Sequence, residues 1–415
     1  MDITVKTFTP TSAVPADQPD AVHWLTAVAA GFQDTAPSDE SIALQLRDAA
    51  ELGFRLRGAY DSDTGGVRDV TDPVATLLSW DTTVNIGGRL TAVNAISDVT
   101  TRATHRRQGL LRNLMTADLS DAADRGIPLA ALTVSEAGIY RRFGFGPAVQ
   151  TVEVTVRTDA SFAVTTPRIG RMEIVDRSVY LSHSAALFDQ FHSGTSGSVQ
   201  RTPGMSQVLS GFDQSTGKPD PKARHALHLA PDGTVDGAVA WFTEGDEKVR
   251  LYDLIAPDPA VSVQIWDLLG SLDLIRSVSS RRIRVDDPVR YALAEPDVYQ
   301  VQGRRDFLWL RVLDVPTVMT ARRYLMDDDI VIEVVDDLGF AAGVYQLRTR
   351  DGLASVTRTA DAPEVTMDVA ALGSILLGGV SVTTIAAAGH IRGPALHRLA
   401  RLMLTPHAPA SITPF

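Results

Sequence analysis

Apolar and polar positions alternate along the chain with two periods, one typical of strands and one typical of helices. In the first 150 residues segments of the two kinds follow each other, as expected of a mixed α/β domain. The predicted strands are Ile3–Phe8, Phe54–Tyr60, Val74–Thr83, Ala95–Thr101, Leu129–Val134 and Val152–Val156. The predicted helices are Asp20–Gly31, Glu40–Leu46, a longer one that begins after Gly109 and ends at Arg125-Gly126, and a short one after Glu136.

The remainder of the chain repeats this pattern. Between residues 160 and 300, helices are predicted at Leu181–Phe191 and Ser262–Leu272, and strands at Ala226–Leu229, Gly237–Phe242 and Val249–Leu254. After residue 303, strands are predicted at Ile330–Val335, Ala341–Leu347 and Ala354–Thr359, and helices at Val315–Tyr324, Val369–Leu377 and Leu396–Leu404. The predicted fold class is α/β (α+β) with mixed sheets, and 415 residues are too many for one core.

One uncharged segment, Val369–Gly389, is long enough to cross a membrane. Its glycine, serine and threonine residues lower its hydrophobicity, so we expect a buried helix and strand of a globular domain instead. The first twenty residues lack a basic stretch followed by an apolar run. We therefore expect no signal peptide and a cytoplasmic protein.

Composition narrows the possible functions. Hydrophobic residues make up 44% of the chain and charged residues 21%, with a formal net charge of −11, which is typical of a globular protein. An acidic surface argues against general nucleic-acid binding and favours cationic partners. Because the chain has no cysteine, disulfides, thiolate metal sites and a cysteine nucleophile are excluded.

The turn before the longer helix has the features of a phosphate site. Arg106 and Arg107 stand just before Gly109, at the predicted helix N-terminus. Guanidinium groups, unpaired backbone N–H groups and the positive end of the helix dipole would surround one point there, and glycine lets the backbone approach closely. A pyrophosphate would fit this turn, although an ordinary solvated turn is an equal alternative from these residues alone.

Two motifs resemble those of the GCN5-related N-acetyltransferases, the GNAT superfamily. Arg106-Arg107-Gln108-Gly109-Leu110-Leu111 is similar to the motif R/Q-x-x-G-x-G/A, which binds the pyrophosphate of acetyl-CoA in that family, with leucine in place of the last small residue. Tyr140-Arg141-Arg142-Phe143-Gly144-Phe145 resembles the following motif, Y-x-x-x-G-F. THRRQGLLRNLM at 104–115, SEAGIYRRFGFGP at 135–147, the chain length and the terminal phenylalanine resemble the Eis-like (enhanced intracellular survival) branch of actinobacteria.

The resemblance implies two tandem GNAT-like domains followed by a sterol-carrier-protein-like α/β domain. The expected limits are 1–150 for the catalytic domain, 151–302 for a degenerate GNAT-like domain and 303–415 for the third domain. In the second domain Asp258 and two prolines stand where the arginines and glycine would be. Since a carboxylate would repel a pyrophosphate, we expect no cofactor site there. A homohexamer, as a dimer of trimers, is implied by the resemblance alone.

The resemblance also implies acetyl-CoA as the cosubstrate and assigns roles to residues. The expected cofactor-binding residues are Val99, Thr101, Arg106, Arg107, Gln108, Gly109, Leu110, Leu111 and Ser135. Backbone groups of Val99 and Thr101 would pair with the pantetheine arm as an added strand does. Phe32, Asp34 and Asp98 are expected in the acceptor cleft, where Asp34 would hold an ammonium group or merely cap the next segment. No metal site is expected.

Amide formation needs a base and an acid. An aliphatic ammonium, with a pKa near 10, must lose a proton before it attacks a thioester, and the leaving thiolate must gain one. Tyr140 is the expected acid, unless its hydroxyl only packs against the cofactor. The resemblance suggests the α-carboxylate of Phe415 as the base, against the alternative of a frayed tail. Glu136 and His105 are rival bases, and His105 is expected in a solvated turn.

Three functions stay open at this point. The first choice is an N-acetyltransferase that acts on primary amines of polycationic small molecules such as aminoglycosides. The second is an acetyltransferase with one narrow acceptor, such as a metabolite amine, a polyamine or a protein lysine. The third is a CoA- or lipid-binding regulator without activity. Release of CoA thiol with a panel of amines distinguishes the three.

Overall fold

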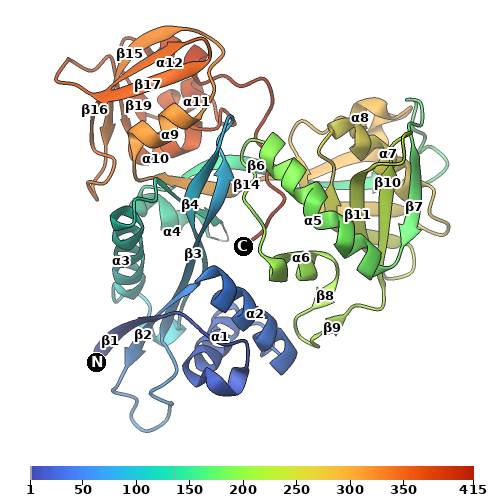
Figure 1. Cartoon of the computed structure of the whole chain (residues 1–415), viewed down its shortest axis with the longest axis horizontal. Coiled ribbons are helices and arrows are strands. Elements are labelled where there is room, and N and C mark those ends of the chain that lie inside the picture. The colour runs from blue at the N-terminus through green and yellow to red at the C-terminus, as the bar shows by residue number, and fades with distance from the viewer. Residues whose placement is uncertain (1, 135) are drawn as a thin grey trace.

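The computed structural model describes residues 2–134 and 136–415 and shows three lobes (Figure 1). The first lobe contains β1 (Ile3–Phe8), α1 (Pro19–Phe32), α2 (Asp39–Leu52), β2 (Arg55–Asp61), β3 (Ala75–Asn85), β4 (Leu90–Thr101), α3 (Leu110–Asp124), β5 (Leu129–Thr133), α4 (Ala137–Tyr140) and the start of β6 (Gly146–Arg157).

The second lobe contains β7 (Arg171–Val175), α5 (Arg177–Gly194), α6 (Pro203–Leu209), β8 (Phe212–Asp213), β9 (Lys218–Pro219), β10 (Ala223–Leu229), β11 (Val235–Glu244), β12 (Lys248–Ile255), α7 (Pro259–Gly270), β13 (Ser277–Arg284), α8 (Val289–Ala292) and the start of β14 (Tyr299–Val312). The third contains α9 (Val315–Ala321), β15 (Asp328–Val335), β16 (Gly343–Arg350), β17 (Leu353–Arg358), β18 (Val365–Asp368), α10 (Val369–Ile375), α11 (Val382–Ala387), β19 (Ile391–Arg392) and α12 (Leu396–Leu402).

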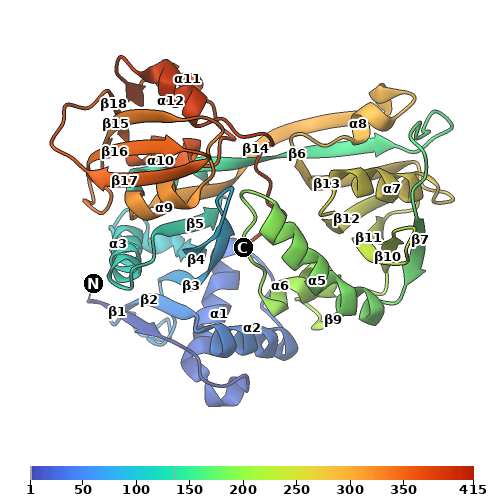
Figure 2. The same cartoon turned by 45° about the horizontal axis from the view of Figure 1, so that its top comes forward.

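The first two lobes share one continuous sheet. Among the described residues it has twelve strands in the order β1-β2-β3-β4-β5-β14-β6-β13-β12-β11-β10-β7. The long strands β6 and β14 pair antiparallel at its centre and run from one lobe into the other (Figure 2). Strand β14, which follows the second lobe in sequence, lies between β5 and β6. The two lobes thus exchange strands, and β6 and β14 cross the domain limits expected at 150 and 302, which stay predictions.

Strands β4 and β5 separate partway along their length. They pair in parallel only from Asn94 to Ile96, opposite Ala130 to Leu132. Just beyond this point β4 contains a β-bulge, where its register against β3 shifts between Ser97 and Thr100. Asp98 in the bulge has a φ of 51°, and its carbonyl accepts a hydrogen bond of 2.7 Å from Thr76 Oγ1. The bulge turns the β4 backbone away from β5 and opens a slot between the two strands.

The second lobe repeats this arrangement, and the C-terminal tail of the chain borders its opening. Strands β12 and β13 pair in parallel over only three residues, from Lys248 to Arg250. Ala410 and Ile412, from the tail after α12, line a small cavity of about 40 Å³ at this opening together with Leu254 and Ile283. The tail runs along the edge of the second lobe, and the chain ends near the centre of the molecule (Figure 2).

The third lobe has a sheet in the order β17-β16-β15-β18-β19 and packs through α10 against β6 and β14. The approach is so close that a Cβ at Gly146 would lie 1.9 Å from the carbonyl oxygen of Ala370. Arg311 on β14 and Asp336, just after β15, form an almost fully buried ion pair with N···O distances of 2.7 and 2.8 Å. These contacts attach the third lobe to the large sheet.

The predicted elements agree with the structure in kind, with one exception. The segment 369–389 is buried at its start, as expected, but its second part forms helix α11 rather than a strand. No helix within residues 2–134 and 136–415 is long and apolar enough to span a membrane. Because α10 and α11 are interrupted by Gly378 and Gly379, neither grows to membrane-spanning length.

Candidate active site

Helix α3 presents its N-terminus beside two exposed arginines. Gly109 is the N-cap residue and has a φ of 80°, in the left-handed region that glycine adopts without strain. Arg106, Arg107 and Gln108 are exposed, and Arg106 Nε lies 3.4 Å from the carbonyl oxygen of Thr101. The first N–H groups of a helix have no partner within it. The turn thus combines positive charge, backbone donors and an open approach, which suits a pyrophosphate.

The leucines of the same motif have different positions. Leu110 is buried in the first lobe's core together with Leu114 and Met115, whereas Leu111 is half-buried. The side chain of Leu110 therefore anchors the helix, so that its contribution to an anion site is limited to the backbone N–H. The leucine that replaces the usual small residue at 111 leaves the helix N-terminus exposed.

A slot lies between the separated ends of β4 and β5, and β4 leads on to this turn. Its walls are formed by Phe32, Ile96, Ser97, Asp98, Val99, Leu132, Thr133, Val134, Tyr140 and Phe415. Tyr140 is 5% exposed and packs edge-to-face on Phe145, with ring centroids 6.3 Å apart. Val99 and Thr101 lie on the part of β4 that has separated from β5. Their position suits a linear ligand that pairs with the strand.

The end of the chain lies in the same slot. The Thr133 hydroxyl donates to the terminal oxygen of Phe415 and accepts a hydrogen bond of 3.1 Å from its N–H. The Phe415 ring packs edge-to-face on Trp80 at 5.5 Å. Upstream, the N–H of Ala410 donates to the carbonyl of Ser196 at 2.8 Å, and the Thr413 hydroxyl donates to the carbonyl of Val199 at 2.9 Å. The tail is therefore held along its length and is not frayed.

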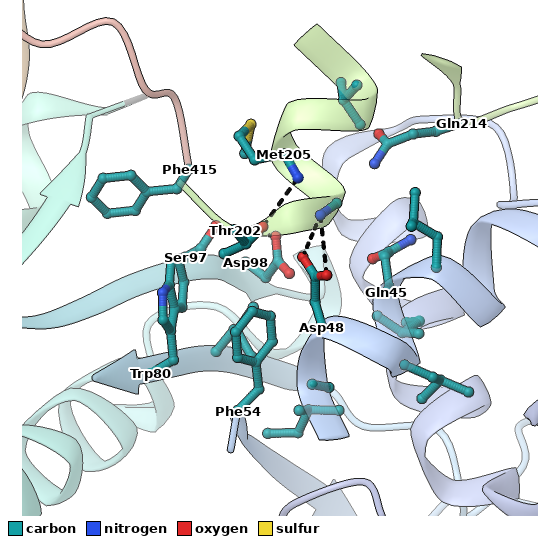
Figure 3. A pocket seen from close by; sticks show the side chains of 18 of the residues that line it. Gln45, Asp48, Phe54, Trp80, Ser97, Asp98, Thr202, Met205, Gln214 and Phe415 are labelled. Atoms are coloured by element: carbon teal, nitrogen blue, oxygen red, sulfur yellow. Dashed lines mark hydrogen bonds between the residues drawn. The ribbon is translucent and has the colours of Figure 1, made fainter. Parts of the chain in front are cut away.

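A second cavity meets the slot at Ser97, Asp98 and Phe415. It has a volume of about 160 Å³ and lies between α1, α2, β3, β4 and α6. Figure 3 shows Phe415, Trp80 and Phe54 at one end of this cavity and Gln45 and Gln214 at the other. We call it the acceptor cavity, because it opens to the slot at the one place where the slot and the chain terminus meet.

Two carboxylates border the acceptor cavity. Asp98 is half-buried, and desolvation raises its pKa to about 6, partly opposed by a hydrogen bond from the Ser97 hydroxyl. Both oxygens of Asp48 accept from the N–H of Gly204, at 2.9 and 3.1 Å (Figure 3). Burial raises the pKa of Asp48 as well, against hydrogen bonds from Thr202 and Gly204 that lower it. Asp48 is therefore engaged in joining α2 to α6, whereas Asp98 borders both the cavity and the slot.

Of the other predicted site residues, some border the slot and others lie away from it. Phe32 borders the slot at the end of α1, whereas Asp34 is exposed beyond that helix. Glu136 is exposed at the start of α4. His105 is not in a solvated turn as expected, because its side chain is only 12% exposed and its Nε2 lies 3.2 Å from Asp61 Oδ2. Ser135 lies outside the described residues.

Sequence reasoning missed Thr133, Asp48 and the aromatic pair Phe54 and Trp80. Thr133 ends a predicted strand, and its partner Phe415 is 282 residues away. No local signal distinguishes such a threonine from any other strand residue. Within the described residues, no group of histidines and carboxylates could hold a metal ion.

Two parallel strands that separate beside an arginine-flanked helix N-terminus are the arrangement expected of the GNAT fold, and the first lobe has it. The family model "Acetyltransferase (GNAT) domain" matches residues 15–148, and another model of the same description matches 197–312. The model "Sterol carrier protein domain" matches 315–411. The chain is thus a GNAT-type N-acetyltransferase with a repeated fold.

Similar proteins show to which branch of the GNAT superfamily the chain belongs. A Streptomyces griseus protein described as an "Uncharacterized N-acetyltransferase" is 34% identical over 405 residues, which cover 92% of this chain and 91% of the relative. N-acetyltransferase Eis of Mycobacterium tuberculosis H37Ra is 31% identical over 350 residues, or 81% and 84% of the two chains. Eis1 from Mycobacterium abscessus superposes with a TM-score of 0.80 at 27% identity and covers 99% of this chain and 100% of its own. The chain belongs to the Eis-like GNAT acetyltransferases.

Proposed function

We propose that the protein transfers the acetyl group of acetyl-CoA directly to a primary amine, with Tyr140 as the acid and the α-carboxylate of Phe415 as the base. The observation that carries this proposal is the junction of the slot and the acceptor cavity. Ser97, Asp98 and Phe415 border both spaces, so that a ligand in one can meet a ligand in the other.

The first lobe has the residues needed to hold acetyl-CoA. Arg106, Arg107 and the N–H groups after Gly109 would bind the pyrophosphate, and the free edge of β4 at Val99 and Thr101 would pair with the pantetheine arm. When bound there, acetyl-CoA supplies a thioester carbon as the site of attack. In the second lobe, the carboxylate of Asp258 caps α7 by accepting from the N–H of Ala260 at 2.9 Å. This cap and the tail residues that border the strand opening support one cofactor site per chain.

The proton steps follow from the positions of the chain terminus and Tyr140. The ammonium of the acceptor loses one proton to the Phe415 carboxylate, directly or through a water, and its lone pair attacks the thioester carbon. The new C–N bond forms, the C–S bond breaks, and the nitrogen loses its second proton to the medium. Tyr140 gives its phenolic proton to the departing thiolate and takes one up again from the medium, and the Phe415 carboxyl group releases its proton to the medium. The net products are an acetamide, CoA thiol and one proton.

The acceptor expected from the family resemblance is a polycation such as an aminoglycoside, with polyamines and protein lysines as alternatives. The net charge of −11 supports a cationic acceptor. A homohexamer is part of this proposal through the resemblance only, and light scattering after gel filtration tests it. The role of Phe32 and Asp34 as acceptor contacts is likewise a proposal, supported for Phe32 by its place beside the slot.

Displacement of the chain terminus tests the proposed base. Two residues, Gly-Ser, added after Phe415 would move the carboxylate away from Thr133 while leaving the ring in the chain. Since a positioned base contributes about 10²- to 10⁴-fold, we expect kcat at neutral pH to fall by that order, with CoA binding retained. The control is the same two residues inserted between the exposed Gly65 and Gly66. An extended enzyme with full activity on every amine would remove Phe415 from the mechanism.

A further inference from the structure

The acceptor cavity has walls that differ from those expected for a polycation. Its sides are apolar side chains from three layers, namely α1 and α2 on one side, β2 and β3 on another and α6 on the third. These include Leu25, Phe54, Leu56, Leu78, Trp80 and Met205. Five of the six are at most 8% exposed, and Met205 is half-buried. A ligand body in this space would exchange water for hydrocarbon and ring surfaces.

Two side-chain carboxylates and the terminal carboxylate of Phe415 border the cavity. Both oxygens of Asp48 already accept from the N–H of Gly204. Asp98 lies at the junction with the slot, beside the chain terminus. At the opposite end the polar groups are the neutral amides of Gln45 and Gln214 (Figure 3). The cavity thus offers a partner for one ammonium group and for no second one deeper inside.

The volume of the acceptor cavity also favours a small acceptor with one ammonium group. The cavity volume is about 160 Å³, and an apolar cavity of about 150 Å³ holds one benzene molecule. The rings of Phe54 and Trp80 are 4.9 Å apart, and Trp80 packs on Phe415, so that aromatic surface continues up to the junction. A multi-ring sugar with several ammonium groups would have to leave most of its body outside or bury unpaired charge, which is costly.

From these three observations we infer that the preferred acceptor is a primary amine with one ammonium group and an uncharged apolar body about the size of one ring, such as an arylalkylamine. Asp98 holds the ammonium at the junction, and the apolar walls hold the body. This inference rests on the proposed acetyl transfer, whose step is unchanged: the amine nitrogen forms the bond to the acetyl carbon, the C–S bond breaks, and CoA leaves as the thiol.

The test is a comparison of kcat/KM for CoA-thiol release by the purified full-length protein at saturating acetyl-CoA. The amines are 2-phenylethylamine, hexylamine, spermidine and kanamycin, with the acetylated products identified by mass spectrometry. We expect kcat/KM for 2-phenylethylamine to exceed those for spermidine and kanamycin at least tenfold. Equal or higher values for either polycation would overturn the inference and leave the acetyl transfer standing. No acetylated product from any amine would refute the acetyl transfer and this inference together.

A charge placed in the wall provides a second test. Met205→Glu adds a carboxylate to the apolar wall of the cavity, at a residue that does not border the slot, and Met205→Gln is the matched neutral control of the same size. For Met205→Glu we expect kcat/KM for 2-phenylethylamine to fall about tenfold and the ratio of spermidine to 2-phenylethylamine to rise at least tenfold. The neutral control should change this ratio less than threefold. If both variants fold, as judged by thermal melting, and the ratio is the same in both, the apolar walls do not select the acceptor.

Discussion

Removal of one hydroxyl group tests how the chain terminus is held in the active site. Thr133 is the last residue of β5, and its hydroxyl both donates to the terminal oxygen of Phe415 and accepts from its N–H. Thr133→Val keeps the shape and the β-branched side chain that favours a strand. The variant removes both hydrogen bonds while leaving the Phe415 ring in contact with Trp80.

The expected effect follows from the charge of the terminal group. A hydrogen bond to a charged partner contributes about 1.5–3 kcal/mol. If this energy serves to position the carboxylate in the transition state, kcat falls by about 10- to 150-fold, since about 1.4 kcal/mol corresponds to a factor of ten. The KM for acetyl-CoA should stay unchanged, because the turn at Arg106 and Arg107, which we propose binds the pyrophosphate, is not altered.

The assay is the initial rate of CoA-thiol release with a saturating amine, at pH 7 and pH 9. Thr133→Ser is the matched control, because it retains a hydroxyl at the same position and should keep most of the activity. Thermal melting shows whether each variant is folded. A folded Thr133→Val enzyme with the kcat of the parent would refute the reasoning that this hydroxyl positions the terminal carboxylate for catalysis.

Two further variants test the electrostatics of the site and the attachment of the third lobe. Burial raises the pKa of Asp98 to about 6, so kcat/KM should rise as the pH passes through about 6 and the carboxylate proposed to bind the ammonium forms. Asp98→Asn should abolish this rise and lower kcat/KM above pH 6. The same rise of kcat/KM in the variant would contradict the role proposed for Asp98. Since the pKa of Asp98 in the folded protein is above the ordinary value of 3.8, ionisation of Asp98 opposes folding. The melting temperature of Asp98→Asn should therefore increase relative to that of the parent as the pH rises from about 4 to about 7. Asp336→Asn leaves Arg311 buried without its carboxylate and should lower the free energy of unfolding by about 3–5 kcal/mol. Glu173→Gln in the exposed pair with Arg171 should lower it by less than about 1 kcal/mol. If urea titrations give the same free energy of unfolding for both variants, the buried pair does not stabilise the attachment of the third lobe.

Elements with strong periodicity could be predicted from the sequence, and elements with a polar half could not. Helix α3 and strand β5 begin and end within two residues of their predicted bounds, and β4 ends as predicted but begins at Leu90 rather than Ala95. No strand was predicted where β14 lies, and its first half, Gln300–Arg305, is mostly polar and exposed. That half is a strand because it pairs with β6. Such pairing is a tertiary effect that local propensity does not contain.

The site shows the same limit. The pyrophosphate turn lies within four consecutive residues, 106–109, so that sequence spacing was sufficient to propose it. The environment of Phe415 depends on Thr133, Val199 and Ser196, which are 200 residues or more away in the chain. His105 was misplaced for the same reason, because its partner Asp61 comes 44 residues earlier. The apolar character of the acceptor cavity also arises only when α1, α2, β3 and α6 pack together.

The central claim is that the arginine-flanked N-terminus of α3 binds the pyrophosphate of acetyl-CoA. Isothermal titration of CoA into the parent and into the double variant Arg106→Glu, Arg107→Glu tests it most directly, because both side chains are exposed and the fold does not depend on them. Two charge-assisted contacts of about 1.5–3 kcal/mol each correspond to a Kd raised by about 10²- to 10⁴-fold, with an unchanged melting temperature. A folded double variant that binds CoA with the Kd of the parent would contradict the account.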